Sequence, residues 1–149
     1  MDKAHQPIDI LLVEDSAGDA RLTREALAEG KVANRLHVVR DGIAACDFLR
    51  HRGSYLNSPR PNLILLDLNL PRKTGHEVLT EIKKDEDLKR IPVIVLTTSR
   101  EERDVMKSYD LYANCYLAKP VDVEEFLRVV RGIDDFWLSL VQLPEDSTP

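Results

Sequence analysis

Several residues that can do metal or phosphate chemistry stand directly after short apolar runs of the sequence. They are Glu14 and Asp15 after the first run, Asp67 after the third, Thr97 after the fourth and Lys119 after the fifth. Taken singly, an acid at such a place usually caps the next helix, and a lysine or threonine there is usually solvated. If the runs are parallel strands of one sheet, their carboxyl ends meet at one edge, where ligands bind. The joint placement therefore predicts a single site.

The acids of this site predict a divalent cation. Carboxylates packed together repel, and their pKa values rise unless a cation neutralises them. Mg²⁺ prefers oxygen ligands, keeps several waters and often acts beside phosphate. An aspartate held at such a metal can attack phosphorus, while the metal and a lysine neutralise the transferring oxygens. We expect Glu14, Asp15 and Asp67 to hold Mg²⁺, with Lys119 opposite and the Thr97 hydroxyl able to donate to a phosphoryl oxygen.

The elements that must position these residues alternate along the chain. Apolar runs predict strands at 8–13, 36–39, 63–66, 93–96 and 115–118, and amphipathic segments predict helices at about 18–29, 42–51, 75–84, 100–112 and 122–141. Nearly continuous aliphatic runs are typical of parallel strands covered on both faces. The (βα)₅ order predicts an α/β fold with a doubly wound five-stranded parallel sheet and right-handed crossovers.

Composition limits the class of protein. The 149 residues, 43% hydrophobic and 32% charged, fit one globular domain, which we place at 8–141 between an arm (1–7) and a tail (142–149). The net charge of −5 argues against nucleic acid or an anionic membrane as a partner. The chain has neither a membrane-spanning apolar run nor a signal-peptide core at its start, so a cytoplasmic location is expected. Cys46 and Cys115 lack metal-ligand spacing and are expected to be small buried residues.

Four motifs resemble the receiver domain of two-component response regulators, over residues of roughly 8 to 135. They are the pair Glu14-Asp15, the segment 65–71 followed by Gly75, the segment 91–97, and the segment 116–120. The resemblance implies a flavodoxin-like receiver fold and a switch that accepts a phosphoryl group from a sensor histidine kinase. It implies no enzymatic activity other than the protein's own phosphotransfer and slow dephosphorylation.

The resemblance also implies roles for single residues. Asp67 matches the phospho-acceptor, and Lys119, in a cis bond to proline, matches the lysine that pairs with the phosphoryl group. The Mg²⁺ ligands would be the side chains of Asp15 and Asp67, the backbone carbonyl of Asn69, and Glu14 largely through water. Thr97 matches the switch hydroxyl, and Tyr116 the aromatic that moves inward with it. Glu14 stands where the family often has aspartate, and Thr98 where it often has alanine.

A closer resemblance is to the small regulators paired with cyanobacterial or bacterial phytochromes. It is based on the loop 52–61 and on the segments 68–75 and 136–144. It implies a phytochrome-type kinase as the partner. Too few residues follow the receiver pattern for an output domain, so we expect the output to be protein–protein contact.

The last predicted helix has two apolar faces. Phe126, Leu127, Val130 and Trp137 can face the sheet, while a second stripe is formed by Val129, Ile133, Phe136 and Leu140. A helix that is apolar on two faces is usually buried on two sides. We therefore expect a homodimer through the surface of the fourth helix, fifth strand and fifth helix. The alternative is that the extension folds back on its own domain.

Three rival functions are weaker. A phosphohydrolase of the haloacid dehalogenase type needs a second acid two residues after its nucleophile, but Asn69 cannot transfer a proton there. A dinucleotide-binding domain needs a glycine-rich turn after the first strand, where this chain has acids that would repel pyrophosphate. A degenerate receiver that is only a scaffold is disfavoured because Asp15, Asp67, Thr97 and Lys119 are all present.

Overall fold

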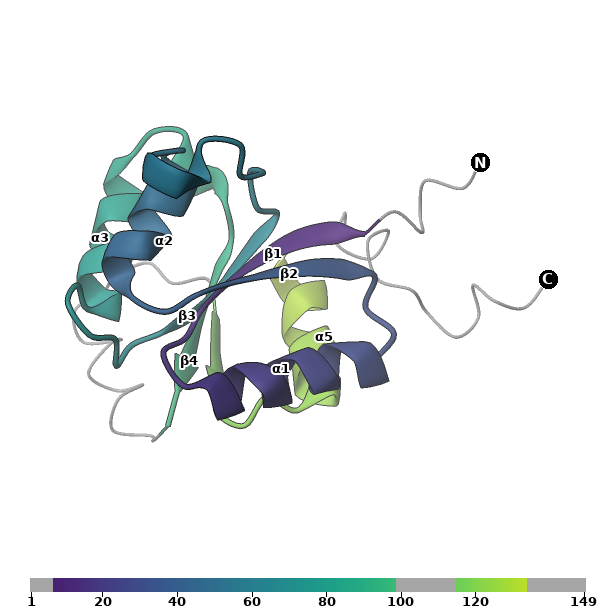
Figure 1. Cartoon of the computed structure of the whole chain (residues 1–149). Helices are drawn as coiled ribbons and strands as arrows, with labels where there is room; N and C mark the ends of the chain where they lie inside the picture. The colour runs from purple at the N-terminus through teal and green to yellow at the C-terminus, as the bar shows by residue number, and fades with distance from the viewer. Residues whose placement is uncertain (1–6, 99–114, 134–149) are drawn as a thin grey trace, which may run out of the picture.

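A computed structural model describes residues 7–98 and 115–133, and its centre is a five-stranded parallel sheet (Figure 1). The strands are β1 (Ile8–Val13), β2 (Asn34–Val39), β3 (Leu63–Asp67), β4 (Val93–Thr97) and β5 (Cys115–Ala118), in the spatial order β2-β1-β3-β4-β5. The predicted doubly wound parallel sheet is confirmed. The order reverses beside β1, so a crevice for ligands is expected at the carboxyl ends of β1 and β3.

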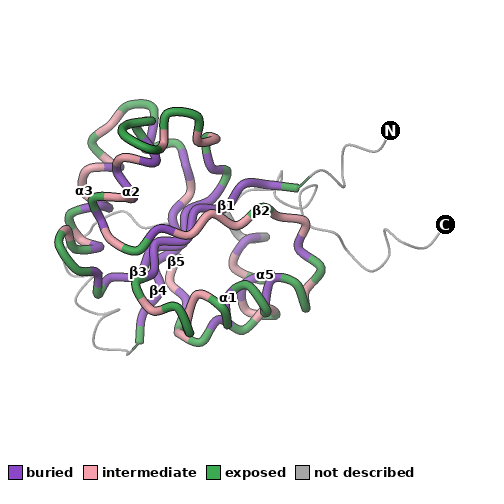
Figure 2. Tube along the Cα trace, viewed as in Figure 1, coloured by how far each residue is buried: buried purple, intermediate pink, exposed green. Residues whose placement is uncertain are grey.

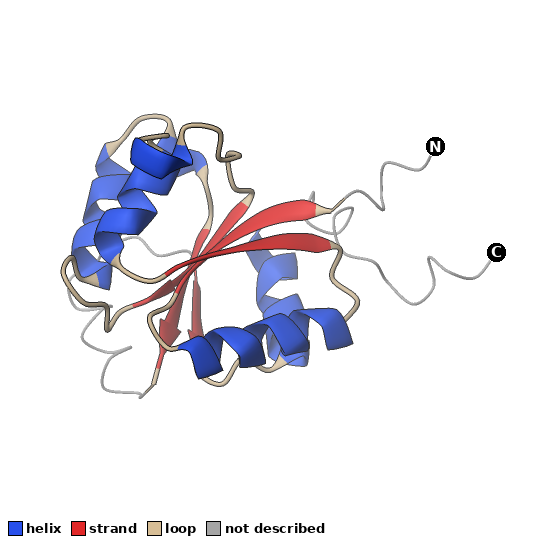
Figure 3. Ribbon diagram, in the orientation of Figure 1, coloured by secondary structure: helices blue, strands red, loops and turns tan. Residues whose placement is uncertain are grey.

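The helices cover both faces of the sheet (Figure 3). They are α1 (Ala17–Glu29), α2 (Gly42–Leu49), α3 (Gly75–Lys84) and α5 (Val123–Ile133), with single 3₁₀ turns η2 (Gly53–Tyr55) and η3 (Leu88–Arg90). In Figure 1, α2 and α3 lie on one face, and α1 and α5 on the other. None of the helices in the described ranges is long and apolar enough to cross a bilayer.

The central strands are buried along their whole length (Figure 2). Successive side chains of a strand point to opposite faces. Leu11 and Leu66 therefore join the core under α2 and α3, whereas Leu12 and Leu65 join the core under α1 and α5. Burial on both faces explains the nearly continuous aliphatic runs of β1, β3 and β4 in the sequence. The two cores fix the strands that carry the candidate site.

The ends of some elements differ from the sequence prediction. β1 and β5 have the predicted bounds, but β2 begins two residues early, because Asn34 and Arg35 pair with Ile8 and Asp9 of β1. The Arg35 guanidinium also donates to Asp9, with Nε 2.9 Å from Oδ1. The sequence prediction missed this part of the strand because Asn34 and Arg35 are polar and do not continue the apolar run. Strands β3 and β4 each extend one residue further than predicted, to Asp67 and Thr97. The helix predicted at 100–112, and the part of the last helix beyond residue 133, lie outside the described residues.

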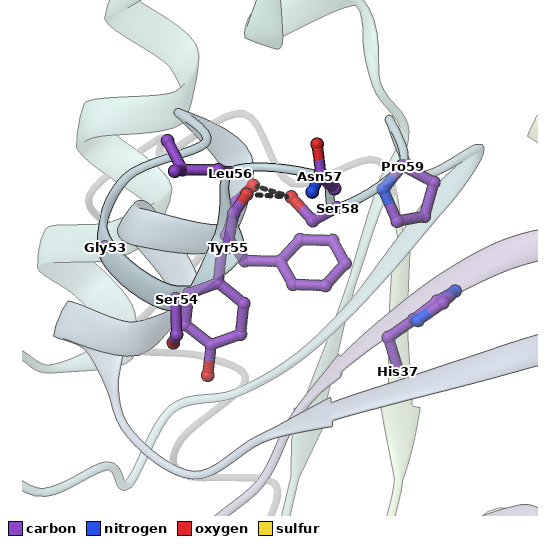
Figure 4. A pocket seen from close by; sticks show the side chains of 9 residues that line it. His37, Gly53, Ser54, Tyr55, Leu56, Asn57, Ser58 and Pro59 are labelled. Carbon is purple, nitrogen blue, oxygen red and sulfur yellow. Dashed lines mark hydrogen bonds between the residues drawn. The ribbon is translucent and has the colours of Figure 1, made fainter.

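The predicted loop at 52–61 is folded against α2 and contains the turn η2. The Ser58 hydroxyl lies 2.7 Å from the carbonyl oxygen of Phe48 and 2.9 Å from that of Tyr55 (Figure 4). The rings of Phe48 and Tyr55 pack with centroids 5.5 Å apart. Between this loop and His37 of β2 lies an open hollow of about 530 Å³, and none of the residues that line it is an acid. The hollow therefore has no part in the carboxylate chemistry.

Candidate functional site

The residues predicted to do chemistry lie at the carboxyl edge of the sheet. Glu14 follows β1, Asp67 and Thr97 are the last residues of β3 and β4, and Lys119 follows β5. Strand β3 pairs with β1 on one side and with β4 on the other. Asp67 therefore lies on the strand between those that lead to Glu14 and Thr97.

Lys119 contacts three acids from two separate parts of the chain. Its Nζ lies 3.0 and 3.2 Å from the two carboxylate oxygens of Glu14, 3.0 Å from Oδ2 of Asp67 and 2.9 Å from Oδ2 of Asp19. Only 9% of the Lys119 side chain is exposed. Burial alone would lower the pKa of Lys119, but hydrogen bonds to Asp19, Glu14 and Asp67 outweigh burial and raise that pKa. The lysine is thus held as a buried cation among carboxylates.

Asp19 is a residue of the site that the sequence analysis missed. It lies in the first turn of α1, where its backbone N–H donates to Oγ of the N-cap Ser16 at 3.1 Å. The side chain of Asp19 is 41% exposed, so it forms the solvent side of the group around Lys119. In the sequence, Asp19 has the position of an ordinary acid in the first turn of a helix, three residues after the N-cap Ser16, so nothing there indicated contact with Lys119.

Three acids fit a divalent cation. Glu14, Asp15 and Asp67 each offer a carboxylate oxygen, and these oxygens all lie within 4.8 Å of one another. Burial and the adjacent Asp67 carboxylate raise the pKa of Glu14 to about 7, which is the response expected of crowded carboxylates. Hard oxygen ligands of this kind are those that Mg²⁺ and Mn²⁺ take. Asp15 is exposed, so the cluster is open to solvent on that side.

The turn after β3 holds Asp67 in place. The backbone N–H of Asn69 donates to Oδ1 of Asp67 at 3.1 Å, and that of Gly75 donates to the Leu68 carbonyl oxygen at 3.1 Å. A Cβ atom on Gly75 would lie 2.5 Å from the carbonyl oxygen of Asp67, closer than real Cβ contacts come. Helix α3 then follows its N-cap Thr74, whose side chain forms a capping box with Glu77. Glycine at position 75 is therefore required for α3 to approach the site.

Thr97 is the last residue of β4, and Tyr116 lies on the neighbouring strand β5. Thr97 is buried, and its hydroxyl donates to the carbonyl oxygen of Leu117 across a long 3.4 Å. The Thr97 carbonyl accepts from the backbone N–H of Lys119 at 2.8 Å, which ties the end of β4 to the lysine. Tyr116 is half-buried and packs against the core under α2 and α3. The bond between Lys119 and Pro120 is cis, as the family resemblance implies.

The predicted dimer stripe lies mostly outside the described residues. Val129 is half-buried and packs against the core under α1 and α5. Ile133 is the last described residue of α5, and Phe136 and Leu140 lie beyond it. The dimer therefore stays a prediction.

Similar proteins are known over nearly the whole chain. The family model for the response regulator receiver domain matches residues 10–131. Response regulator Rcp1 of Synechocystis sp. is 55% identical over 143 residues, covering 96% of this chain and 97% of Rcp1. The structure of the Mn²⁺-bound form of Rcp1 is 56% identical, has a TM-score of 0.71, and matches 93% of this chain and 99% of that one.

Two further solved structures are similar. The bacteriophytochrome response regulator AtBRR is 42% identical with a TM-score of 0.85, and the match covers 94% of this chain and 99% of that one. The phosphorylated cyanobacterial phytochrome response regulator RcpA is 52% identical with a TM-score of 0.72, and the match covers 93% and 99% of the two chains. Sequence and fold therefore agree over the described residues.

Proposed function

The chain belongs to the response regulator receiver family, and on that basis we propose that Asp67 is the residue that accepts the phosphoryl group. The observation that carries this assignment is the central position of Asp67. Its carboxylate contacts Lys119, belongs to the acidic cluster and lies on the strand between Glu14 of β1 and Thr97 of β4. A phosphoryl group there would meet the Lys119 ammonium and the Thr97 hydroxyl from the side of β4 and β5, and the acids that would hold a cation from the side of β1.

The transfer is a displacement at phosphorus. An oxygen of Asp67 attacks the phosphorus of a phosphohistidine on the partner kinase, forming an O–P bond as the P–N bond breaks. The electron pair of the broken bond stays on the imidazole nitrogen, which takes a proton from solvent. Lys119 neutralises charge on the phosphoryl oxygens. Water then attacks the same phosphorus slowly and breaks its bond to the Asp67 oxygen, which releases phosphate, so the protein acts on its own acyl phosphate and not on a separate substrate.

The divalent cation of this site is proposed to be Mg²⁺. Glu14, Asp15 and Asp67 would hold it, together with the Asn69 backbone carbonyl, and it would supply neutralisation of negative charge during transfer. All-oxygen donors and the need to work beside phosphate favour Mg²⁺. The Mn²⁺-bound structure of Rcp1 supports a divalent site in this family.

Phosphorylation is proposed to be read out through Thr97 and Tyr116. A phosphoryl group adds about −1.5 to −2 charges and three acceptor oxygens. The Thr97 hydroxyl, whose bond to Leu117 is long, would turn to donate to one of these oxygens. Tyr116 would then move into the vacated space, which changes the surface around β5.

The partner is proposed to be a phytochrome-type sensor histidine kinase. The support is the similarity to AtBRR and RcpA, which are named as phytochrome response regulators. We further infer a homodimer through Val129, Ile133, Phe136 and Leu140, and no nucleic-acid partner because the chain carries a net charge of −5. The cytoplasmic location expected from the sequence stays a prediction.

The acceptor is tested by phosphorylating the purified protein with acetyl phosphate and with a labelled candidate kinase. Intact mass should rise by one phosphoryl group, in a reaction that needs Mg²⁺ and is lost in Asp67→Asn. Asp41→Asn is the matched control, because Asp41 also follows a strand but caps α2 through the backbone N–H of Ala44 at 2.7 Å. Asparagine caps helices as well as aspartate does, so this variant should label normally. Equal labelling of Asp67→Asn and the wild type would overturn the assignment.

The dimer is tested separately by sedimentation of the wild type and of Val129→Glu, each with and without acetyl phosphate. A wild-type dimer that the substitution weakens supports the proposal. A wild-type monomer under both conditions contradicts it.

A further inference from the structure

Asp19 contacts the site through Lys119 and stands apart from the acids that fit the metal. It is not among the three acids whose oxygens lie within 4.8 Å of one another. Its Oδ2 lies 2.9 Å from Nζ of Lys119. Its side chain is 41% exposed, whereas those of Glu14 and Asp67 are almost fully buried. Asp19 therefore lies on the solvent side of the lysine, away from the buried partners.

Lys119 and a divalent cation compete for the same oxygens. A lysine ammonium has three protons to donate, and here it is shared among three carboxylates. Two of these carboxylates, Glu14 and Asp67, also belong to the acidic cluster that fits the cation. A cation that binds there draws on the same lone pairs and repels the ammonium. The lysine then needs a carboxylate that the cation does not use, and Asp19 is in place to supply it.

The position of Asp19 is fixed by the start of α1. Its backbone N–H donates to the Ser16 hydroxyl, so the backbone of Asp19 is held in the first turn of the helix. The partial positive charge at the N-terminus of a helix favours a carboxylate in that turn. Asp19 therefore presents its carboxylate to Lys119 from a backbone position that is fixed by the helix start.

Building on the proposed function, we propose that Asp19 is the positioning residue for Lys119 when a divalent cation binds. Its carboxylate would keep the ammonium on the solvent side of the acidic cluster, where Glu14 and Asp67 would be free to hold the cation. Cation and lysine are then present together, as phosphoryl transfer to Asp67 requires. Without Asp19, the partners that the ammonium keeps among the described residues are Glu14 and Asp67, so a cation that binds must displace it from both.

The experiment is a titration of Mg²⁺ alone, followed by calorimetry, into four proteins: wild type, Asp19→Asn, Lys119→Met and the double variant. We expect Asp19→Asn to weaken Mg²⁺ binding about tenfold in the wild-type background and less than about twofold in the Lys119→Met background. The loss depends on the lysine because Asp19 acts through it. If Asp19→Asn weakens Mg²⁺ binding equally in both backgrounds, Asp19 acts only as a general negative charge, and the proposal is overturned. The proposal is also overturned if Asp19→Asn does not weaken Mg²⁺ binding at all.

Two further variants separate positioning from a simple change of charge or of fold. Asp19→Glu keeps the carboxylate one methylene further out and should restore most of the Mg²⁺ affinity. Glu25→Gln removes another exposed acid of α1 and should leave the affinity at the wild-type value. A circular dichroism spectrum of each variant establishes that it is folded, and Asp19→Ser replaces Asp19→Asn if that protein does not fold.

The outcome also distinguishes this inference from the proposed function. If the wild type binds no Mg²⁺, or if Asp67→Asn is phosphorylated as the wild type is, the proposed function fails. If the wild type binds Mg²⁺ and is phosphorylated on Asp67 while Asp19→Asn binds Mg²⁺ normally, only the role of Asp19 fails.

Discussion

The ammonium of Lys119 lies 3.0 Å from Oδ2 of Asp67, although 52 residues separate the two in the sequence. Strand β4 lies between the strands that carry them, so the contact spans three strands at the carboxyl edge. The same ammonium contacts Glu14. One lysine thus neutralises two almost fully buried acids that would otherwise repel each other.

Removing this lysine should destabilise the protein unless a metal replaces its charge. In Lys119→Met, Glu14 and Asp67 remain buried without a cation, and loss of one partner of a buried ion pair costs about 3 kcal/mol. Urea unfolding at neutral pH without metal should show this loss, and saturating Mg²⁺ should remove most of it. Lys89→Met is the control, because Lys89 pairs with Glu86 on the surface, where such pairs contribute less than about 1 kcal/mol. Unchanged stability of Lys119→Met without metal would contradict the buried-charge argument.

Two glycines should respond to alanine in opposite directions. At Gly75 the new Cβ would meet the Asp67 carbonyl at 2.5 Å and Cα of Leu68 at 2.6 Å, so the turn that holds Asp67 must shift. We expect Gly75→Ala to cost about 1–3 kcal/mol and to weaken Mg²⁺ binding. At Gly18, on the exposed start of α1, the new Cβ has only Ser16 Oγ nearby, at 3.9 Å. Gly18→Ala should therefore stabilise the protein by up to about 1 kcal/mol. Thermal unfolding measures both changes in stability. Unchanged stability of Gly75→Ala would show that the turn can shift without cost.

The sheet could be predicted from the sequence because its inner strands are apolar on both faces. Leu63 to Leu66 and Val93 to Leu96 give continuous aliphatic runs that few other structures produce. The edge strand β2 was harder, since its first residues are polar and pair with β1 through the backbone. The turn η2 was missed because the side chains that hold it, such as Ser58, bond to carbonyl oxygens that a sequence does not place.

The site was only partly predictable, because some of its contacts follow from the order of the strands and others from the packing of a helix. Parallel strands bring their carboxyl ends together whatever the side chains are, so the meeting of Glu14, Asp67 and Lys119 follows from topology. Asp19 lies on a helix, and its approach to Lys119 depends on how α1 packs on the sheet. That packing is a tertiary property. Topology explains why these residues lie close together. Their individual roles were inferred from the family resemblance.

Asp9 should make stability depend on acidic pH. Hydrogen bonds from Arg35, whose Nε lies 2.9 Å from Oδ1, hold the pKa of the Asp9 carboxyl below its ordinary value of 3.8, and His37 adds to the effect against the opposing effect of burial. A lowered acid pKa means that the ionised form is favoured in the folded state. The resulting stability is fully present above pH 3.8 and is lost as the pH falls through the folded-state pKa.

Asp9→Asn should remove the contribution of the Asp9 charge to stability, which lowers the free energy of unfolding by about 1 kcal/mol at neutral pH. The gap between the two proteins should close as the pH falls below 3.8, which urea unfolding at a series of pH values would measure. Asp47→Asn is the control, because Asp47 meets Arg52 only at 3.5 Å on the surface, and should cost less than about 0.5 kcal/mol at any pH. A gap that persists unchanged into acid would show that the Asp9 charge is not its cause.

Thr97→Val should separate phosphorylation from its readout. Valine has nearly the volume of threonine, so the buried position at the end of β4 stays filled, and the bond lost among the described residues is the 3.4 Å one to the Leu117 carbonyl. Mg²⁺-dependent phosphorylation should persist, because no contact of Asp67 with Lys119 or the acidic cluster involves this hydroxyl. The hydroxyl that would bond the phosphoryl group is gone, however, and a hydrogen bond to a charged group contributes about 1.5–3 kcal/mol.

The measurement is the backbone amide spectrum of β5 with and without acetyl phosphate. In the wild type the signals of Tyr116 and Leu117 should move on phosphorylation, whereas in Thr97→Val the protein should carry phosphate with these signals near their unphosphorylated positions. Thr98→Val changes the exposed neighbour and should behave as the wild type does. A lost hydrogen bond of this size corresponds to at least a tenfold change in the balance of the two conformations, since each 1.4 kcal/mol is a factor of ten. The same shift of β5 in Thr97→Val and the wild type would therefore exclude the hydroxyl as the switch.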